Sequence, residues 1–366
     1  IILVYFTFYV SSGMVAGGVF FKSSFGMDYH LGMVIVAAIT VVYTLIGGFL
    51  AVSYTDFVQG VMMVAALVMV PVAGIIRLGG LSNLKHAIAE VDPHYWVIWG
   101  PTTTLLGVIS ALAWGLGYFG QPHIIVRFMA IRSPREAVAG GTIGIGWMLF
   151  AVLGAAGTAI VGVATYQHDK KQLADPETVF ITLGKLLFHP LVAGFMLAAI
   201  LAAIMSTVSS QLLVTSSALI EDLYGSFART RDAKVSGNRM VLYSRMAVFA
   251  IALVAAVMAW NPSKTILALV AFAWAGFGAS FGPTILLSLY WKRLSAMGAF
   301  AGMITGAVVV MIWGYASGGP GGIFDIYEIL PGFLGNLAVA VAVSHMSQPS
   351  KEISEEFDAA VAASRS

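Results

Sequence analysis

The chain has 366 residues, of which 59% are hydrophobic and only 10% are Asp, Glu, Lys or Arg, and its formal net charge is +2. Soluble proteins have roughly 45–50% apolar and about 25% charged residues, so this composition excludes a soluble globular protein, and disordered chains are far more polar. The apolar excess must face lipid. The absence of Cys excludes disulfides and thiolate metal sites, and the scattered basic residues give nucleic-acid binding no support.

Ten apolar runs are each long enough to cross a bilayer, which requires about 20 apolar residues in a helix. The runs are continuous, whereas the strands of a membrane β-barrel alternate over about ten positions, so helices are favoured. Small residues four apart indicate close helix approach. Such pairs are Gly13/Gly17, Gly140/Gly144 and Gly302/Gly306. The expected spans are about 1–21, 31–50, 54–76, 102–122, 137–164, 190–218, 240–260, 264–291, 296–316 and 328–346.

The distribution of Lys and Arg predicts the orientation of these spans. One set of alternate connections, counted with the C-terminal tail, carries eleven Lys and Arg residues, and the other set carries seven. The richer set lies in short connections, where the positive-inside rule has most weight, so we expect the first residue and the C-terminus in the cytoplasm. Two outer connections should contain short helices, at 82–91 and at 175–188. The second is either a surface helix or an outer lid, and the polar tail at 347–366 should be solvated.

Two Gly-rich stretches, at 113–123 and 274–283, interrupt apolar spans. Gly and Pro at this density disfavour a continuous helix, and irregular backbone at membrane depth lies beside a cavity. We therefore expect two broken helices next to a transport site, with a simple packing kink as the alternative. Trp114 and Tyr118 are four apart and share a face if the local turn is helical, so they suit a cation attached to an apolar ring.

Hydroxyl groups interrupt the span at 190–218, in the sequence AIMSTVSS (203–210). The carbonyl of Ala203 and the hydroxyls of Ser206 and Thr207 would place three oxygens within one turn, as a Na⁺ site requires. The alternative is that each hydroxyl bonds back to the preceding turn. Asp56 either caps a helix N-terminus or is a functional charge in lipid.

No constellation typical of an enzyme is present, because a Ser-His-Asp set, a phosphate-binding loop and paired core carboxylates are all missing. We therefore expect a protein that is not an enzyme. Its partners would be a small solute, Na⁺ and the lipid bilayer, with no nucleic acid. The sequence predicts no oligomeric state.

Five stretches of the chain resemble the sodium:solute symporter family, and most closely its proline-transporting members. The resemblance runs in order over about residues 1–346. The stretches are GGFLAVSYTDFVQGVMM (47–63), WGLGYFGQPHIIVRFMA (114–130), ILAAIMSTVSSQLLVTSSALIEDLY (200–224), AWAGFGASFGP (273–283) and WKRLSAMGAFAGM (291–303).

This resemblance implies an all-α polytopic membrane protein with a core of two inverted five-helix repeats. Residues 1–346 would form a ten-span transporter domain, with core helices three to ten over about 1–291 and peripheral helices over about 296–346. Residues 347–366 would form a cytoplasmic tail. The first two core helices would precede residue 1, so we expect the chain as it stands to lack part of its sodium shell and to be inactive alone.

The resemblance also implies Na⁺-coupled symport of L-proline across a bacterial plasma membrane by alternating access, with Na⁺ as coupling ion and no cofactor. The matching solute-site residues are Tyr9, Trp114, Tyr118 and Pro122. The matching sodium ligands are Ala203, Ser206 and Thr207, and Asp56 matches an acid linked indirectly to sodium dependence. Two alternatives remain open: a Na⁺ symporter for pantothenate, a monocarboxylate or a sugar, and a transporter-like membrane sensor domain.

Overall fold

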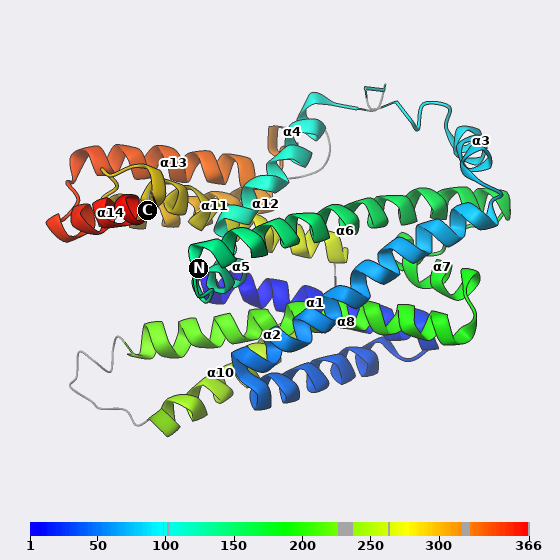
Figure 1. The fold of residues 1–366 in the computed structure, drawn as a ribbon, viewed down its shortest axis with the longest axis horizontal. Coiled ribbons are helices and arrows are strands. Elements are labelled where there is room, and N and C mark those ends of the chain that lie inside the picture. Colours follow the sequence, from blue (N-terminus) through cyan, green and yellow to red (C-terminus); the bar gives the residue numbers. More distant parts are fainter. Residues whose placement is uncertain (98, 101–102, 226–236, 263, 317–322, 365–366) are drawn as a thin grey trace. The chain divides into compact units, whose positions relative to one another are not determined.

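The computed structural model describes residues 1–366 apart from 98, 101–102, 226–236, 263, 317–322 and 365–366, and the described residues form helices and no strand (Figure 1). The chain forms two compact units, which we describe separately. The first unit comprises Ile1–Tyr9, Pro101–Ala130 and Leu267–Ser366, and the second comprises Val10–Gly100 and Ile131–Ile266. Helix α1 (Ile2–Phe25) contributes to both.

The second unit is built from long helices joined by short outer helices. Its elements after α1 are α2 (Tyr29–Arg77), α3 (Leu81–Val91), α6 (Pro134–His168), η2 (Pro176–Thr178), α7 (Val179–Leu187), α8 (Pro190–Ser217), the π-helical η3 (Ala218–Tyr224) and α10 (Gly237–Ala259). The predicted helices at 82–91 and 175–188 are confirmed as α3 and as η2 with α7. Asp175 caps the latter by accepting a hydrogen bond from the Glu177 N–H at 3.0 Å.

The first unit contains the shorter helices around residues 105–130 and the C-terminal helices. Its elements are α4 (Leu105–Ala113), the 3₁₀ helix η1 (Trp114–Gly120), α5 (Pro122–Met129), α11 (Ile266–Tyr290), α12 (Ala296–Ala316), η4 (Ile323–Asp325), α13 (Ile329–Met346) and α14 (Lys351–Ser364). The first residue of α11 belongs to the second unit. Most of the polar tail is therefore the helix α14.

Eight helices among the described residues are long and apolar enough to cross a membrane. Helix α2 has 49 residues and a length of about 74 Å at 1.5 Å per residue, which is more than twice the hydrocarbon core of a bilayer. It therefore supplies two spans, joined at Gly48, whose φ of 60° and ψ of −162° interrupt the helix. The predicted spans at 31–50 and 54–76 are confirmed, with a one-residue interruption in place of a loop.

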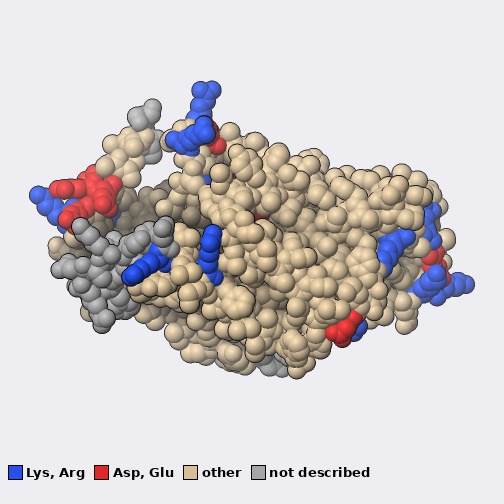
Figure 2. Space-filling view, turned by 90° about the horizontal axis from the view of Figure 1, so that it is seen from below, with Lys and Arg blue, Asp and Glu red and all other residues tan. Residues whose placement is uncertain are grey.

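Large apolar side chains point outward from the helices of each unit. Examples in the second unit are Ile46 at 78% exposed, Phe57 at 73% and Ile143 at 73%. Figure 2 shows one face, on which uncharged residues cover most of the surface and charged side chains occur in a few groups. Exposed apolar surface on this scale marks contact with something other than water, as expected for helices surrounded by lipid.

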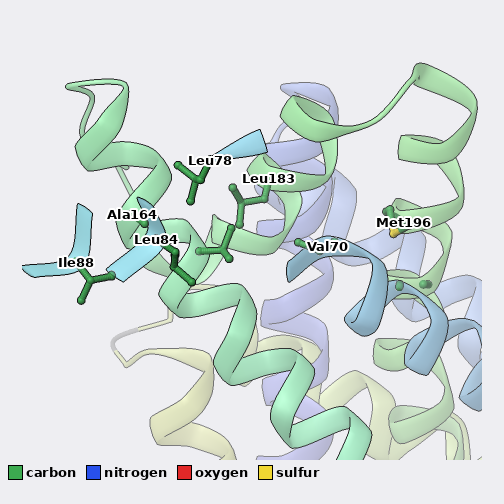
Figure 3. Packing of buried hydrophobic residues seen from close by; sticks show 10 residues of the cluster. Val70, Leu78, Leu84, Ile88, Ala164, Leu183 and Met196 are labelled. Atoms are coloured by element: carbon green, nitrogen blue, oxygen red, sulfur yellow. The ribbon is translucent and has the colours of Figure 1, made fainter. Parts of the chain in front are cut away.

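A buried apolar cluster joins five helices of the second unit (Figure 3). Leu84 and Ile88 of α3 and Leu183 of α7 are buried together with residues of α2, α6 and α8. Each fully buried Leu or Ile side chain contributes roughly 1.5–3 kcal/mol. The two outer helices are therefore packed parts of this unit, which explains why the short amphipathic sequences fold as helices.

Close helix approach occurs at two of the three predicted glycine pairs. A Cβ atom on Gly13 would lie 2.3 Å from Val208 Cγ2, and one on Gly302 would lie 2.3 Å from Asn336 Oδ1. At Gly140/Gly144 the structure shows no such approach among the residues it describes, since a Cβ on Gly144 meets none of their atoms within 4 Å. Glycine is abundant in membrane helices, so its spacing alone does not identify a packed face.

The prediction of a broken helix at 274–283 is also wrong. Helix α11 runs through this stretch from Ile266 to Tyr290 with Pro283 inside it. Proline lacks the N–H that would bond to the carbonyl four residues earlier, which belongs to Ala279. Asn336 of α13 supplies the missing donor, with Nδ2 at 2.8 Å from Ala279 O and 2.7 Å from Ser280 O. The alternative interpretation, in which Gly and Pro serve helix packing and do not interrupt the helix, therefore agrees better with this stretch.

Candidate functional site

The predicted break at 113–123 is confirmed and lies in the first unit. Helix α4 ends at Ala113, the chain tightens into η1, Gln121 is extended with φ −83° and ψ 109°, and α5 begins at Pro122. The glycines allow η1 to lie directly against α11. A Cβ on Gly117 would lie 1.8 Å from Trp274 Nε1, and one on Gly120 would lie 2.4 Å from Phe277 O.

Gln121 replaces helical hydrogen bonds at this break. Its side chain is fully buried, and Nε2 donates to the carbonyls of Gly117 at 3.1 Å and Trp274 at 3.2 Å. Each such bond contributes about 0.5–1.5 kcal/mol net, and an unpaired buried group costs about 1–3 kcal/mol. The amide therefore fixes the interrupted segment against α11 in a setting where water cannot satisfy the carbonyls.

An aromatic cluster, defined by Trp114, Tyr118, Trp274 and Tyr327, lies along this break. The ring of Trp114 stacks with Trp274 at a centroid distance of 5.9 Å and with Tyr327 at 5.5 Å. Tyr118 meets Trp274 edge to face at 4.8 Å, and Trp274 Nε1 donates to the carbonyl of Trp114 at 3.0 Å. Tyr118 is 42% exposed, so its ring has surface left for a ligand.

Tyr9 lies near the start of α5 within the same unit. Its side chain is buried, and its ring meets that of His123 edge to face at 6.1 Å. His123 directly follows Pro122, the first residue of α5. The structure thus brings the four predicted solute-site residues into one unit, with Trp114 and Tyr118 linked through Trp274, and Tyr9 and Pro122 linked through His123.

The predicted sodium ligands lie on α8 in the second unit. Ser206 Oγ and Thr207 Oγ1 donate to the carbonyl of Ala203 at 3.1 and 3.0 Å. The hydroxyls therefore bond back to the preceding turn, as the alternative interpretation expected. The same bonds gather three oxygens within one turn, and each hydroxyl oxygen retains lone pairs that can face a cation.

Two polar side chains of α2 contact the hydroxyl stretch of α8. Tyr43 Oη donates to the carbonyl of Met205 at 2.8 Å, and Ser210 Oγ donates to Asp56 Oδ2 at 3.3 Å. The helix-cap interpretation of Asp56 is wrong, because this residue lies within α2, eight residues after the interruption at Gly48. Its carboxylate instead lies beside α8, one turn beyond Thr207.

Four residues of these two sites were not identified from the sequence as ligand-site residues: Tyr43, Gln121, Trp274 and Tyr327. Gln121 and Tyr43 are polar groups inside apolar runs, which is a signal that the sequence does carry. Trp274 and Tyr327 act through contacts with residues more than 150 positions away in the chain. Such contacts leave no local pattern.

Within the described ranges, His, Asp and Glu form no group of three or more that could hold a metal ion. Carbonyl and hydroxyl oxygens are the polar atoms gathered on α8. Hard cations of low charge take ligands of this kind, so the donor set of Ala203, Ser206 and Thr207 fits Na⁺ in its chemistry.

Comparison with known proteins gives relatives over almost the whole chain. The chain is 54% identical over 360 residues to the "High-affinity proline transporter PutP" of Bacillus subtilis (strain 168), with 98% of this chain and 74% of that protein covered. It is 50% identical to the "Osmoregulated proline transporter OpuE" of the same organism, covering 95% and 70%. It is 49% identical to "Sodium/proline symporter 2" of Staphylococcus saprophyticus, covering 98% and 70%.

A solved structure shares the fold. It is described as the substrate-bound outward-open state of a Na⁺-coupled sialic acid symporter, and it matches with a TM-score of 0.73 at 20% sequence identity, covering 96% of this chain and 74% of that one. The predicted all-α, inverted-repeat symporter fold is thereby confirmed. The model of the sodium:solute symporter family matches residues 1–306, and the chain belongs to this family.

Proposed function

We propose that this protein is a Na⁺-coupled symporter that carries L-proline into the cell. The observation that carries the proposal is the identity of 49–54% to proteins named proline transporters and sodium/proline symporters. These names favour proline over pantothenate, a monocarboxylate or a sugar. The interrupted helix with its aromatic cluster supports the proposal independently, because such helices form the sites of secondary transporters.

The solute would bind at Tyr9, Trp114, Tyr118 and Pro122. Proline is a zwitterion with an apolar ring, so its ring and secondary ammonium suit an exposed aromatic face such as that of Tyr118. A cation over such a face is worth about 0.5–2 kcal/mol. The carboxylate suits the backbone N–H groups at the start of a half-helix, which here is α5, beginning at Pro122.

The coupling ion would bind at the carbonyl of Ala203 and the hydroxyls of Ser206 and Thr207. Asp56 would act indirectly, because its contact is with Ser210 on the next turn of α8. One Na⁺ moving through about 100 mV contributes roughly 2.3 kcal/mol, and a tenfold gradient adds about 1.4 kcal/mol. Together these support roughly 500-fold accumulation at one-to-one coupling, provided that Na⁺ and solute stabilise the same conformation.

We propose the bacterial plasma membrane as the location, with the C-terminus in the cytoplasm. Residues 1–346 would form the transporter domain and 347–366 the cytoplasmic tail. Nine Lys and Arg residues in the short connections and two in the C-terminal tail support this orientation. Residues 1–291 would contain core helices three to ten, and the last two spans would be peripheral.

Uptake by the full-length protein in proteoliposomes tests the function. An inward Na⁺ gradient should drive accumulation of labelled proline above the level reached with an equal K⁺ gradient. Excess unlabelled proline should abolish uptake of the label, whereas pantothenate, lactate and glucose should not. Uptake that is indifferent to the cation, or competition by one of the other solutes equal to that by proline, would refute the proposal.

A further inference from the structure

Tyr327 contacts three elements of the first unit, although it lies in the connection between α12 and α13. Its backbone N–H donates to Ser110 Oγ of α4 at 2.9 Å. Its Oη donates to the carbonyl of Ala271 in α11 at 2.7 Å. Its ring stacks on Trp114 of η1 at 5.5 Å with the planes 18° apart. One residue thus binds the segment before the break, the break itself and the helix packed against it.

The backbone at Ile326 and Tyr327 is itself held in place by hydrogen bonds. Trp313 Nε1 of α12 donates to the carbonyl of Ile326 at 3.1 Å, and the N–H of Leu330 in α13 donates to the carbonyl of Tyr327 at 3.0 Å. Backbone atoms on both sides of the tyrosine are therefore fixed to the last two spans. Because the Tyr327 ring stacks on Trp114, the position of the Trp114 ring depends on the positions of α12 and α13.

We propose that Tyr327 is a positioning residue of the solute site, which holds Trp114 and joins α4 to α11 so that the site has a high affinity for its solute. The inference rests on the proposed function, in which Trp114 belongs to the solute site. Its physical basis is preorganisation: a stacked and hydrogen-bonded ring loses less freedom when a ligand binds than a mobile one does. The last two spans then contribute to affinity without supplying a solute ligand.

Initial-rate uptake in proteoliposomes tests this inference with Tyr327→Ala, Tyr327→Leu and Tyr327→Phe. Loss of the ring should raise the KM for proline roughly three- to tenfold, the range given by the loss of one aromatic pair. The maximal rate per transporter and the half-saturating Na⁺ concentration should stay within about twofold. Tyr327→Phe keeps the stack and should recover most of the affinity. Tyr327→Leu also removes the aromatic ring and replaces Tyr327→Ala in the comparison if the alanine protein does not fold.

Tyr315→Ala is the matched control, because this tyrosine of α12 is 79% exposed. It should leave KM unchanged. An unchanged KM in the Tyr327→Ala or Tyr327→Leu protein would overturn the inference, and so would a KM increase of the same size in the Tyr315→Ala protein. A wild-type protein that fails to take up proline would instead overturn the proposed function. The same KM comparison would then be made with the solute that it does transport.

Discussion

Replacing Gly117 with alanine tests whether the contact between η1 and α11 shapes the solute site. The added Cβ would lie 1.8 Å from Trp274 Nε1, so the indole must move by at least about 1.6 Å to restore an ordinary contact of 3.4 Å. That movement breaks its hydrogen bond to the carbonyl of Trp114. Overpacking costs about 1–3 kcal/mol and the lost bond about 0.5–1.5 kcal/mol, which together give about 1.5–4.5 kcal/mol.

Gly115→Ala is the matched control in the same 3₁₀ helix, since a Cβ at Gly115 meets no atom of the described residues within 4 Å. Both substitutions restrict the unfolded chain equally, so the difference between them isolates the contact with Trp274. We expect Gly117→Ala to lower the midpoint of thermal unfolding by several degrees relative to Gly115→Ala and to raise the KM for proline at least tenfold. Adding Trp274→Phe to Gly117→Ala should recover part of the stability.

Two measurements test this prediction: thermal unfolding of the purified protein in nanodiscs and initial-rate proline uptake. If the Gly117→Ala and Gly115→Ala proteins have the same midpoint and the same KM, then η1 does not lie against Trp274 as described. Recovery by Trp274→Phe separates a local clash from general misfolding.

Two further predictions concern the second unit. Tyr43→Phe removes the bond to the carbonyl of Met205, so we expect the half-saturating Na⁺ concentration for uptake to rise about two- to tenfold, and an unchanged Na⁺ dependence would contradict this. Hydrogen bonding by His168 and the nearby charge of Arg77 lower the pKa of Asp169 from its usual value. The ionised Asp169 carboxylate therefore stabilises the folded protein when the pH is above the usual carboxyl pKa, and this stabilisation is lost as the pH falls through the lowered pKa. Asp169→Asn should therefore lower stability by about 0.2–1 kcal/mol at pH 7, and by progressively less as the pH falls below the usual carboxyl pKa, as measured by urea unfolding; an effect that does not shrink on acidification would contradict this.

The sequence predicts the helical spans well because each span is a local property of about 20 residues. Helix α1 and the break at Trp114–Gly120 follow directly from apolar runs and from Gly and Pro at close spacing. The stretch around Pro283 has the same composition, but Asn336, 53 positions later, supplies the donor that keeps α11 continuous. Composition alone does not reveal a donor at that distance.

In the candidate sites, too, the sequence predicts contacts within one helix and does not predict contacts between distant helices. Ser206 and Thr207 are close in sequence to Ala203, so one helical turn brings their oxygens together, through the bonds to the preceding turn that the alternative interpretation expected. The contact of Ser210 with Asp56 joins two helices across 154 positions, and it corrects the interpretation of Asp56 as a cap. A contact between distant helices is set by their packing, which no local sequence pattern specifies.

The proposed Na⁺ site on α8 is tested most directly by the Na⁺ dependence of proline uptake by the full-length protein with Ser206→Ala and Thr207→Ala combined. Thr215→Ala with Ser216→Ala is the matched control, because these residues of α8 also bond back to carbonyls of their own helix. We predict that the first pair raises the half-saturating Na⁺ concentration at least tenfold, while the control stays within about twofold of wild type. Proline uptake by the Ser206→Ala/Thr207→Ala protein with unchanged sensitivity to external Na⁺ would contradict the proposed Na⁺ site.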